Sequence, residues 1–352
     1  MKLCARTLTF LLTAAILAVT ARDARADGPV SIGVNGSGQL SRDAHIGWIR
    51  TGVYWSEINR DSWSPMDFER ADQIVYDAVN NGQQVLYVLS GAPQWCGGGP
   101  RGTVPCPIEF WKAYVDAISK HYNGVVAAYE IWNEPDLQGQ AAYAVGWDFP
   151  LGSNPRYIDY FTEAARIIRA NAPGTLIVGP AMSGSTSRAV TIWEQFDQTW
   201  YPDGKNASSF VDVVSFHHNS RREDEHSEKI ACDIRDRINN IIRRFNPKNG
   251  WKPMWVTEFG WKSDQIGEVS QKTRTKNLLI EMGGGGYGIL RGYNIPRAFI
   301  YVLATCDGDR GWSLYRCDSA NPPVPRYPKW IVSNYLWNLP FPATQSQYTP
   351  RE

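Results

Sequence analysis

The sequence predicts an α/β fold, a single-domain (β/α)₈ TIM barrel, on two observations. Eight short runs of strand-forming apolar residues recur along the chain, and amphipathic helical patterns lie between them. The runs are continuously apolar rather than alternating, as is typical of parallel strands that are covered on both faces. They span residues 30–34, 46–55, 84–90, 126–132, 175–180, 211–217, 254–259 and 297–303.

An open, doubly wound sheet is the alternative arrangement of the same elements. No glycine-rich phosphate-binding loop follows the first apolar run, which disfavours that alternative.

The segments between the runs carry apolar stripes at helical spacing. The segment 64–82 begins with Ser64-Pro65 and ends at Asn81-Gly82, which are helix start and stop signals. The four glycines Gly283–Gly286 predict that a later helix breaks there. The other predicted helices span 107–122, 154–174 and 227–245.

The first 26 residues have the layout of a secretory signal peptide. A basic start precedes an apolar stretch at 8–19 and a small-x-small site at residues 24–26, and the stretch is short for a membrane span. We therefore expect a cleaved signal peptide at 1–26, one barrel domain at 27–352 and a secreted or periplasmic protein. An uncleaved N-terminal anchor is the alternative.

The overall charge and the aromatic content limit the class of partner. A formal net charge of +1 gives no broad attraction to nucleic acid, and no second apolar stretch is long enough for a stable membrane span. Fifteen Trp and seventeen Tyr fit a large core, and they also fit surfaces on which sugar rings stack. We expect a monomer.

Four cysteines flank two short loops that contain glycine. Cys96 with Cys106, and Cys306 with Cys317, predict one disulfide around each loop in an oxidising compartment. Neither pair has the spacing of a zinc site. Cys232 is expected to remain an unpaired thiol.

Two glutamates stand where predicted strands end. Glu134 ends the fourth run and Glu258 ends the seventh, and in a barrel such positions face the open mouth. Both lie in apolar, aromatic surroundings, where a carboxylate without partners is costly. Two carboxylates facing each other across a cleft are what glycoside hydrolysis requires.

The motifs around both acids resemble a known group of enzymes. "IWNEP" and "TEFGW" are similar to the strand ends of the retaining glycoside hydrolases of clan A, which carry two catalytic glutamates on a (β/α)₈ barrel. "IGWIRTGVYW", "IVGPA", "VSFHH" and "GWSLYR" extend the resemblance over most of the chain. Within the clan, family 39 is the most similar and family 5 is next.

The resemblance implies a role for each matching residue. Glu134 would be the general acid/base and Glu258 the nucleophile. Asn133 would bind the sugar 2-hydroxyl, and Arg50 would lie near Glu258 and keep it ionised. Taken alone, Asn133 also fits a turn and Arg50 a structural ion pair.

His217 and His218 point to opposite faces of a strand, so only one enters the cleft, and the resemblance favours His217. A doubled histidine suggests metal, but no HExxH motif or spaced carboxylate accompanies it, and we expect no metal and no cofactor. Asn219 stands where many relatives have a tyrosine that contacts the nucleophile, and Ile300 and Tyr301 stand where relatives often have a tryptophan within the eighth strand.

Four tryptophans follow predicted strands at the rim of the barrel, where they fit either sugar stacking or core packing. These are Trp55, Trp95, Trp261 and Trp312. The sequence thus predicts a secreted retaining glycoside hydrolase for a β-linked polysaccharide or oligosaccharide. An inactive barrel that binds carbohydrate, and a transglycosylase using the same two glutamates, are the alternatives.

Overall fold

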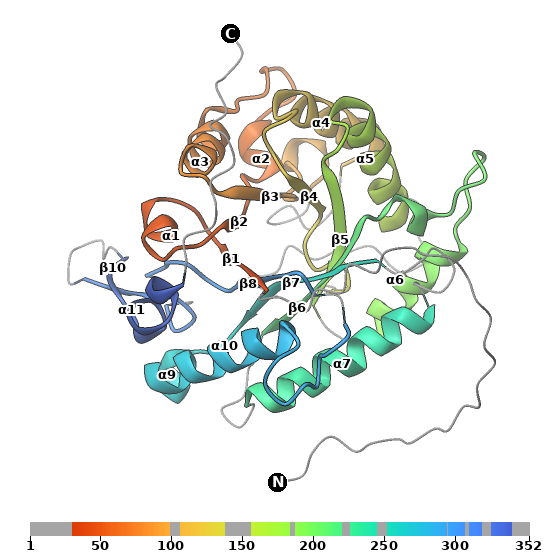
Figure 1. Cartoon of the computed structure of the whole chain (residues 1–352). Helices are drawn as coiled ribbons and strands as arrows, with labels where there is room; N and C mark the ends of the chain where they lie inside the picture. The colour runs from red at the N-terminus through yellow and green to blue at the C-terminus, as the bar shows by residue number, and fades with distance from the viewer. Residues whose placement is uncertain are drawn as a thin grey trace, which may run out of the picture.

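Eight parallel strands close into a barrel in sequence order, and helices surround it (Figure 1). The computed structural model describes residues 30–98, 106–137, 156–183, 187–219, 226–244, 252–293, 295–306, 310–318 and 325–339. The strands are β1 (Ser31–Asn35), β2 (Trp48–Thr51), β3 (Gln84–Leu89), β4 (Ala128–Ile131), β5 (Leu176–Met182), β6 (Val213–Asn219), β7 (Met254–Gly260) and β8 (Arg297–Ile300). The first strand pairs with the second and the eighth, so the predicted (β/α)₈ barrel is confirmed over the open sheet.

The helices and a small sheet lie outside the barrel. The helices are α1 (Gln39–Asp43), α2 (Trp55–Ile58), α3 (Glu69–Asn80), α4 (Ile108–His121), α5 (Tyr157–Asn171), α6 (Ser187–Gln198), α7 (Ser227–Arg244), α9 (Ser263–Ile266), α10 (Glu268–Met282) and α11 (Trp330–Asn334). Strands β9 (Tyr315–Cys317) and β10 (Pro325–Pro328) form an antiparallel pair.

Two helix ends can be compared with the helix start and stop signals in the sequence. Helix α3 begins at Glu69 rather than at Ser64, because Asp61 accepts hydrogen bonds from the amide and the hydroxyl of Ser64 and holds it in a turn. Helix α10 ends at Met282, directly before the glycine run, as predicted.

The barrel interior changes from apolar to polar along the strands. A lower layer near the strand starts is apolar and contains Trp48, Leu86, Ala128, Val178, Val213, Trp255 and Phe299. Two positions further along β2 and β4, the inward side chains are the buried Arg50 and Glu130. The apolar layer therefore closes the bottom of the barrel, and the polar layer leads to its mouth.

Both predicted disulfides are present. Cys96 bonds to Cys106 and Cys306 to Cys317, with Cα–Cα distances of 5.1 and 5.8 Å. The expectation for Cys232 is wrong, because no cysteine of the described residues carries a free thiol and Cys232 is disulfide-bonded. In the part of the chain that the structure describes, no helix combines the length and apolar character needed to cross a bilayer.

Candidate active site

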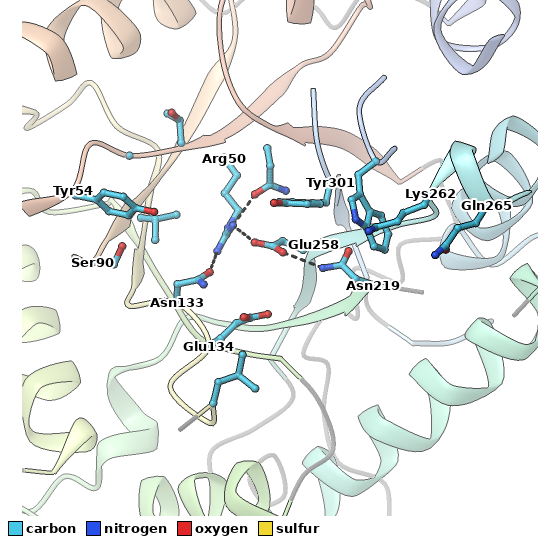
Figure 2. Close-up of a pocket in the computed structure, with 16 residues that line it drawn as sticks. Arg50, Tyr54, Ser90, Asn133, Glu134, Asn219, Glu258, Lys262, Gln265 and Tyr301 are labelled. Carbon is cyan, nitrogen blue, oxygen red and sulfur yellow. Dashed lines mark hydrogen bonds and ion pairs between the residues drawn. The ribbon is translucent and has the colours of Figure 1, made fainter. Parts of the chain in front are cut away.

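The chain turns sharply where β4 ends. Trp132 and Glu134 have φ values of 69° and 47°, in the left-handed region that costs energy for residues other than glycine. The Glu134 amide donates to the carbonyl of Ala181, which has a φ of 50°. This turn takes Asn133 and Glu134 out of the strand and places both in the lining of the cleft (Figure 2).

Glu258 reaches the same cleft from the end of β7. Its neighbour across the β6–β7 pairing is His217. Two residues later, a Cβ atom on Gly260 would lie 2.8 Å from the Tyr301 carbonyl oxygen and 3.3 Å from the Trp312 ring. Glycine therefore allows Tyr301 and Trp312 to pack closely beside Glu258.

Arg50 joins the acids and amides of the site (Figure 2). Its Nη1 donates to Glu258 Oε1 at 2.6 Å and to Asn35 Oδ1 at 2.6 Å. Its Nη2 donates to Asn133 Oδ1 at 2.7 Å, and its Nε donates to Glu130 Oε2 at 2.5 Å. The guanidinium thus fixes Asn133 and Glu258 relative to each other.

Glu130 belongs to this network and was not predicted from the sequence. It lies fully buried inside the barrel, where only one of its carboxylate oxygens has a hydrogen-bond partner. Burial alone would lower the pKa of Arg50, but the carboxylates of Glu130 and Glu258 outweigh it and raise that pKa. The available signal was a charged residue in an otherwise apolar strand. Arg50 shows the same signal in its own strand.

His217 lies between the two predicted catalytic glutamates. Its Nδ1 is 2.8 Å from Glu134 Oε1 and 3.5 Å from Glu258 Oε2. Burial alone would lower the pKa of His217, but the Glu258 and Glu134 carboxylates outweigh it and raise that pKa. The Arg237 guanidinium donates to the His217 carbonyl oxygen. Neither His217 nor His218 is among the described residues that line the cleft; His217 is buried and contacts the two glutamates that do.

The carboxylates of Glu134 and Glu258 are close to each other. One oxygen of each and a ring nitrogen of His217 all lie within 4.8 Å of one another. This spacing would also suit a divalent cation, but Arg50 already donates to Glu258 Oε1, and His217 is hydrogen-bonded to Glu134. A metal would have to break these bonds, so the arrangement fits two cooperating carboxylates better than a metal centre.

The cleft has a volume of about 570 Å³ and opens at the carboxyl ends of the strands. Tyr54 and Ser90 lie at one end of it in Figure 2, and Lys262 and Gln265 lie at the other. Asn219, at the end of β6, donates from Nδ2 to Glu258 Oε2 at 3.1 Å. Each oxygen of Glu258 therefore has its own donor, and the amide of Asn219 makes the contact that the resemblance assigns to a tyrosine.

Of the four rim tryptophans, Trp312 lines the cleft. Trp55 and Trp261 are buried in the core. Trp55 is fully buried and its ring stacks on Tyr114 at 5.1 Å between centroids, so it cannot stack on a sugar.

Trp95 is half-buried and also lies outside the cleft lining. Its indole nitrogen donates to the Asn59 carbonyl oxygen at 2.8 Å, and its ring packs edge-on against Phe110. Tyr54, one position before Trp55, lines the cleft instead and is half-exposed.

Comparison with known protein families identifies the family to which this chain belongs. The sequence matches the cellulase family, glycosyl hydrolase family 5, over residues 31–284, which is more than half of the chain. The chain belongs to glycosyl hydrolase family 5. It is therefore a glycoside hydrolase of clan A, and the match is to the family that the motifs ranked second. No curated protein matches the chain.

Solved structures of similar fold come from members of three glycosidase families. A family 39 glycoside hydrolase from Bacteroides cellulosilyticus WH2 has a TM-score of 0.60 at 16% identity, with 89% of this chain and 65% of that chain covered. An endoglucanase from Pseudomonas stutzeri has a TM-score of 0.57 at 15% identity, with 91% and 97% covered. A β-glucosidase from Thermotoga maritima has a TM-score of 0.61 at 12% identity, with 85% and 84% covered. This chain thus spans about two thirds of the length of the family 39 protein.

Proposed function

We propose that the chain hydrolyses β-linked glycosides with retention of configuration, through a glycosyl-enzyme ester on Glu258. The observation that carries this proposal is the approach of the Glu134 and Glu258 oxygens to within 4.8 Å. Retaining enzymes keep their carboxyl groups about 5 Å apart, whereas inverting enzymes need roughly 6.5–9.5 Å to fit a water between them. The short approach of these oxygens therefore favours the retaining route.

In the first step, a Glu258 oxygen forms a bond to the anomeric carbon as the glycosidic bond breaks. The departing oxygen takes the proton of Glu134, and the products of this step are an ester on Glu258 and a free leaving group. In the second step, Glu134 accepts a proton from water as that water attacks the anomeric carbon. The ester bond breaks, and Glu258 returns to its carboxylate form.

The neighbours of Glu258 support its role as nucleophile. Arg50 donates to one oxygen and Asn219 to the other, and both bonds favour the ionised carboxylate that attack requires. Asn133, held by Arg50, would bind the sugar 2-hydroxyl, a contact that strengthens as the ring flattens. His217 would keep its hydrogen bond to Glu134 while Glu134 changes from a protonated acid to a carboxylate base.

A β-linked polysaccharide or oligosaccharide is the substrate class we propose, in line with the names of the endoglucanase and the β-glucosidase of similar fold. We further propose that the chain acts outside the cytoplasm as one barrel domain. Two disulfides that close short loops support an oxidising compartment.

Substitution of each glutamate separates their roles. We expect Glu258→Ala to abolish turnover of every substrate. We expect Glu134→Ala to retain the first step on aryl glycosides with good leaving groups, because these need little protonation, and added azide should then restore turnover and yield a glycosyl azide. Glu109→Ala, a change at an exposed residue of α4, is the control and should leave activity unchanged. Equal loss on activated and natural substrates without azide rescue would contradict the assignment.

A further inference from the structure

Lys262 places an ammonium group in the cleft. It follows β7 and lines the same cavity as Glu258, at the opposite end from Tyr54 (Figure 2). Its Nζ lies 5.7 Å from the centroid of the Trp312 ring, which offers a cation–π contact. Among the described residues, no carboxylate lies within ion-pair distance of this nitrogen, whereas Lys120, for example, pairs with Asp116.

The backbone on both sides of Lys262 is held in place. The carbonyl oxygen of Trp261 accepts a hydrogen bond from Gln271 Nε2 at 2.8 Å. The amide of Ser263 donates to the Gly311 carbonyl oxygen at 2.9 Å. These bonds fix the backbone from which Lys262 and Trp312 extend, and the Trp312 ring is the contact of the ammonium within that frame. A fixed backbone reduces the entropy lost when a ligand binds.

Arg50, another cation among the described residues of the cleft lining, already forms hydrogen bonds within the protein. Arg50 donates to Glu130, Glu258, Asn35 and Asn133, and its Nη2 also lies 3.3 Å from His217 Nε2, so its N–H groups are all engaged in holding the site. The N–H groups of Lys262 have no such acceptor among the described residues. An ammonium in the cleft lining without an acceptor among the described residues is suited to an anionic group on a ligand.

We propose that the natural substrate carries an anionic substituent close to the bond that is cut, and that Lys262 binds it. A uronic acid carboxylate and a sulfate ester share the required chemistry, a compact anion with several acceptor oxygens. The side-chain amide of Gln265, which also lines this end of the cleft, would bind a neighbouring hydroxyl. This inference rests on the proposed function, because it names the substrate class of the same cleft.

The test compares acidic polymers with neutral polymers of the same backbone. Gellan and xanthan, which contain uronic acid, are assayed beside their carboxyl-reduced forms, and cellulose sulfate is assayed beside hydroxyethyl cellulose. For wild type, Lys262→Gln and Lys262→Arg, kcat/KM is measured from the release of reducing ends, and affinity is measured by electrophoresis in gels that contain each polymer. Lys272→Gln is the matched control, because its ammonium lies 5.8 Å from the centroid of the Trp330 ring outside the cleft lining.

We expect at least one acidic polymer to be bound and cleaved better than its neutral partner. Lys262→Gln should remove about tenfold of that preference, the order of a hydrogen bond to a charged group, and Lys262→Arg should retain most of it. The Lys272→Gln control should behave as wild type. A loss confined to the uronate polymers would assign a carboxylate, and a loss confined to cellulose sulfate would assign a sulfate ester.

Two results would overturn the inference and leave the proposed function standing. These are cleavage of neutral polymers alone, and an equal effect of Lys262→Gln on acidic and neutral forms. A wild-type protein that cleaves no polymer and no aryl glycoside would instead contradict the proposed function itself.

Discussion

Substitution of Arg50 by methionine tests the buried charge network that organises the cleft. The variant keeps most of the side-chain volume but leaves Glu130 and Glu258 without their cation. Removal of one partner of a buried ion pair costs about 3–5 kcal/mol, because the remaining charge stays buried without compensation. At roughly 2 °C per kcal/mol for a chain of this size, the melting temperature should fall by roughly 6–10 °C. Because Asn133 and Glu258 also lose their common donor, kcat/KM should fall by about 10²-fold.

Two further variants show whether charge is the cause. Glu130→Gln in the Arg50→Met background removes the buried carboxylate that has lost its partner and should restore about 1–3 kcal/mol of the free energy of unfolding. Arg297→Met is the matched control, since the Arg297 guanidinium lies over Trp48 and Trp255, at 4.3 and 4.7 Å from the ring centroids. It should lose only about 1 kcal/mol. Urea unfolding gives all four values. An Arg50→Met protein within about 1 kcal/mol of wild type, or a double variant no more stable than the single one, would refute the reasoning.

Two other substitutions probe the neighbours of the glutamates. The pKa of His217 is raised in the fold, so the stability that its protonation contributes is fully present below its ordinary value of about 6.5 and is lost as pH rises through the raised pKa. The difference in unfolding free energy between wild type and His217→Asn should therefore be larger at about pH 5.5 than at about pH 9; a difference that is constant or grows with pH would contradict the raised pKa. Asn219→Ala removes one donor from Glu258 and should lower kcat/KM by about tenfold with little change in KM, measured on an aryl glycoside. Unchanged kinetics would show that Asn219 does not position the nucleophile.

The barrel itself could be predicted because its signals are local and repeated. Continuous apolar runs separated by amphipathic segments specify parallel strands that are covered on both faces, and all eight form. The glycine run after Met282 ends a helix as expected. The start of α3 was misjudged because Asp61 competes for the hydrogen bonds of Ser64, and a nearby side chain of this kind is hard to weigh against a helix start signal.

The motifs indicated which strand ends meet at one cleft, whereas three-dimensional packing decides which neighbouring side chains reach it. The strand ends carry Glu134 and Glu258 to one cleft, and Arg50 and His217 lie beside them, as the motifs indicated. The loop after β2 turns Tyr54 rather than Trp55 toward the cleft, a shift of one position that no composition signal reveals.

The role of Glu130 and the bonded state of Cys232 could also not be predicted from the sequence. Glu130 stands in an apolar strand only four positions before Glu134, but its burial against Arg50 depends on the pairing of distant strands. The bonded state of Cys232 could not follow from loop length, because it has no cysteine near it in the sequence.

Trapping of the glycosyl-enzyme ester tests most directly whether Glu258 is the nucleophile. The protein is incubated with a 2-deoxy-2-fluoro glycoside that has a good leaving group, and the labelled protein is digested and mapped by mass spectrometry. Fluorine destabilises the positively charged transition states of both steps, and the good leaving group allows the first step to proceed, so the ester accumulates. We expect one sugar per chain, attached to Glu258 in the segment that ends β7, and no label in the Glu258→Gln protein. A label on Glu134, or fast turnover of a 2-fluoro sugar that never becomes attached, would contradict the assignment.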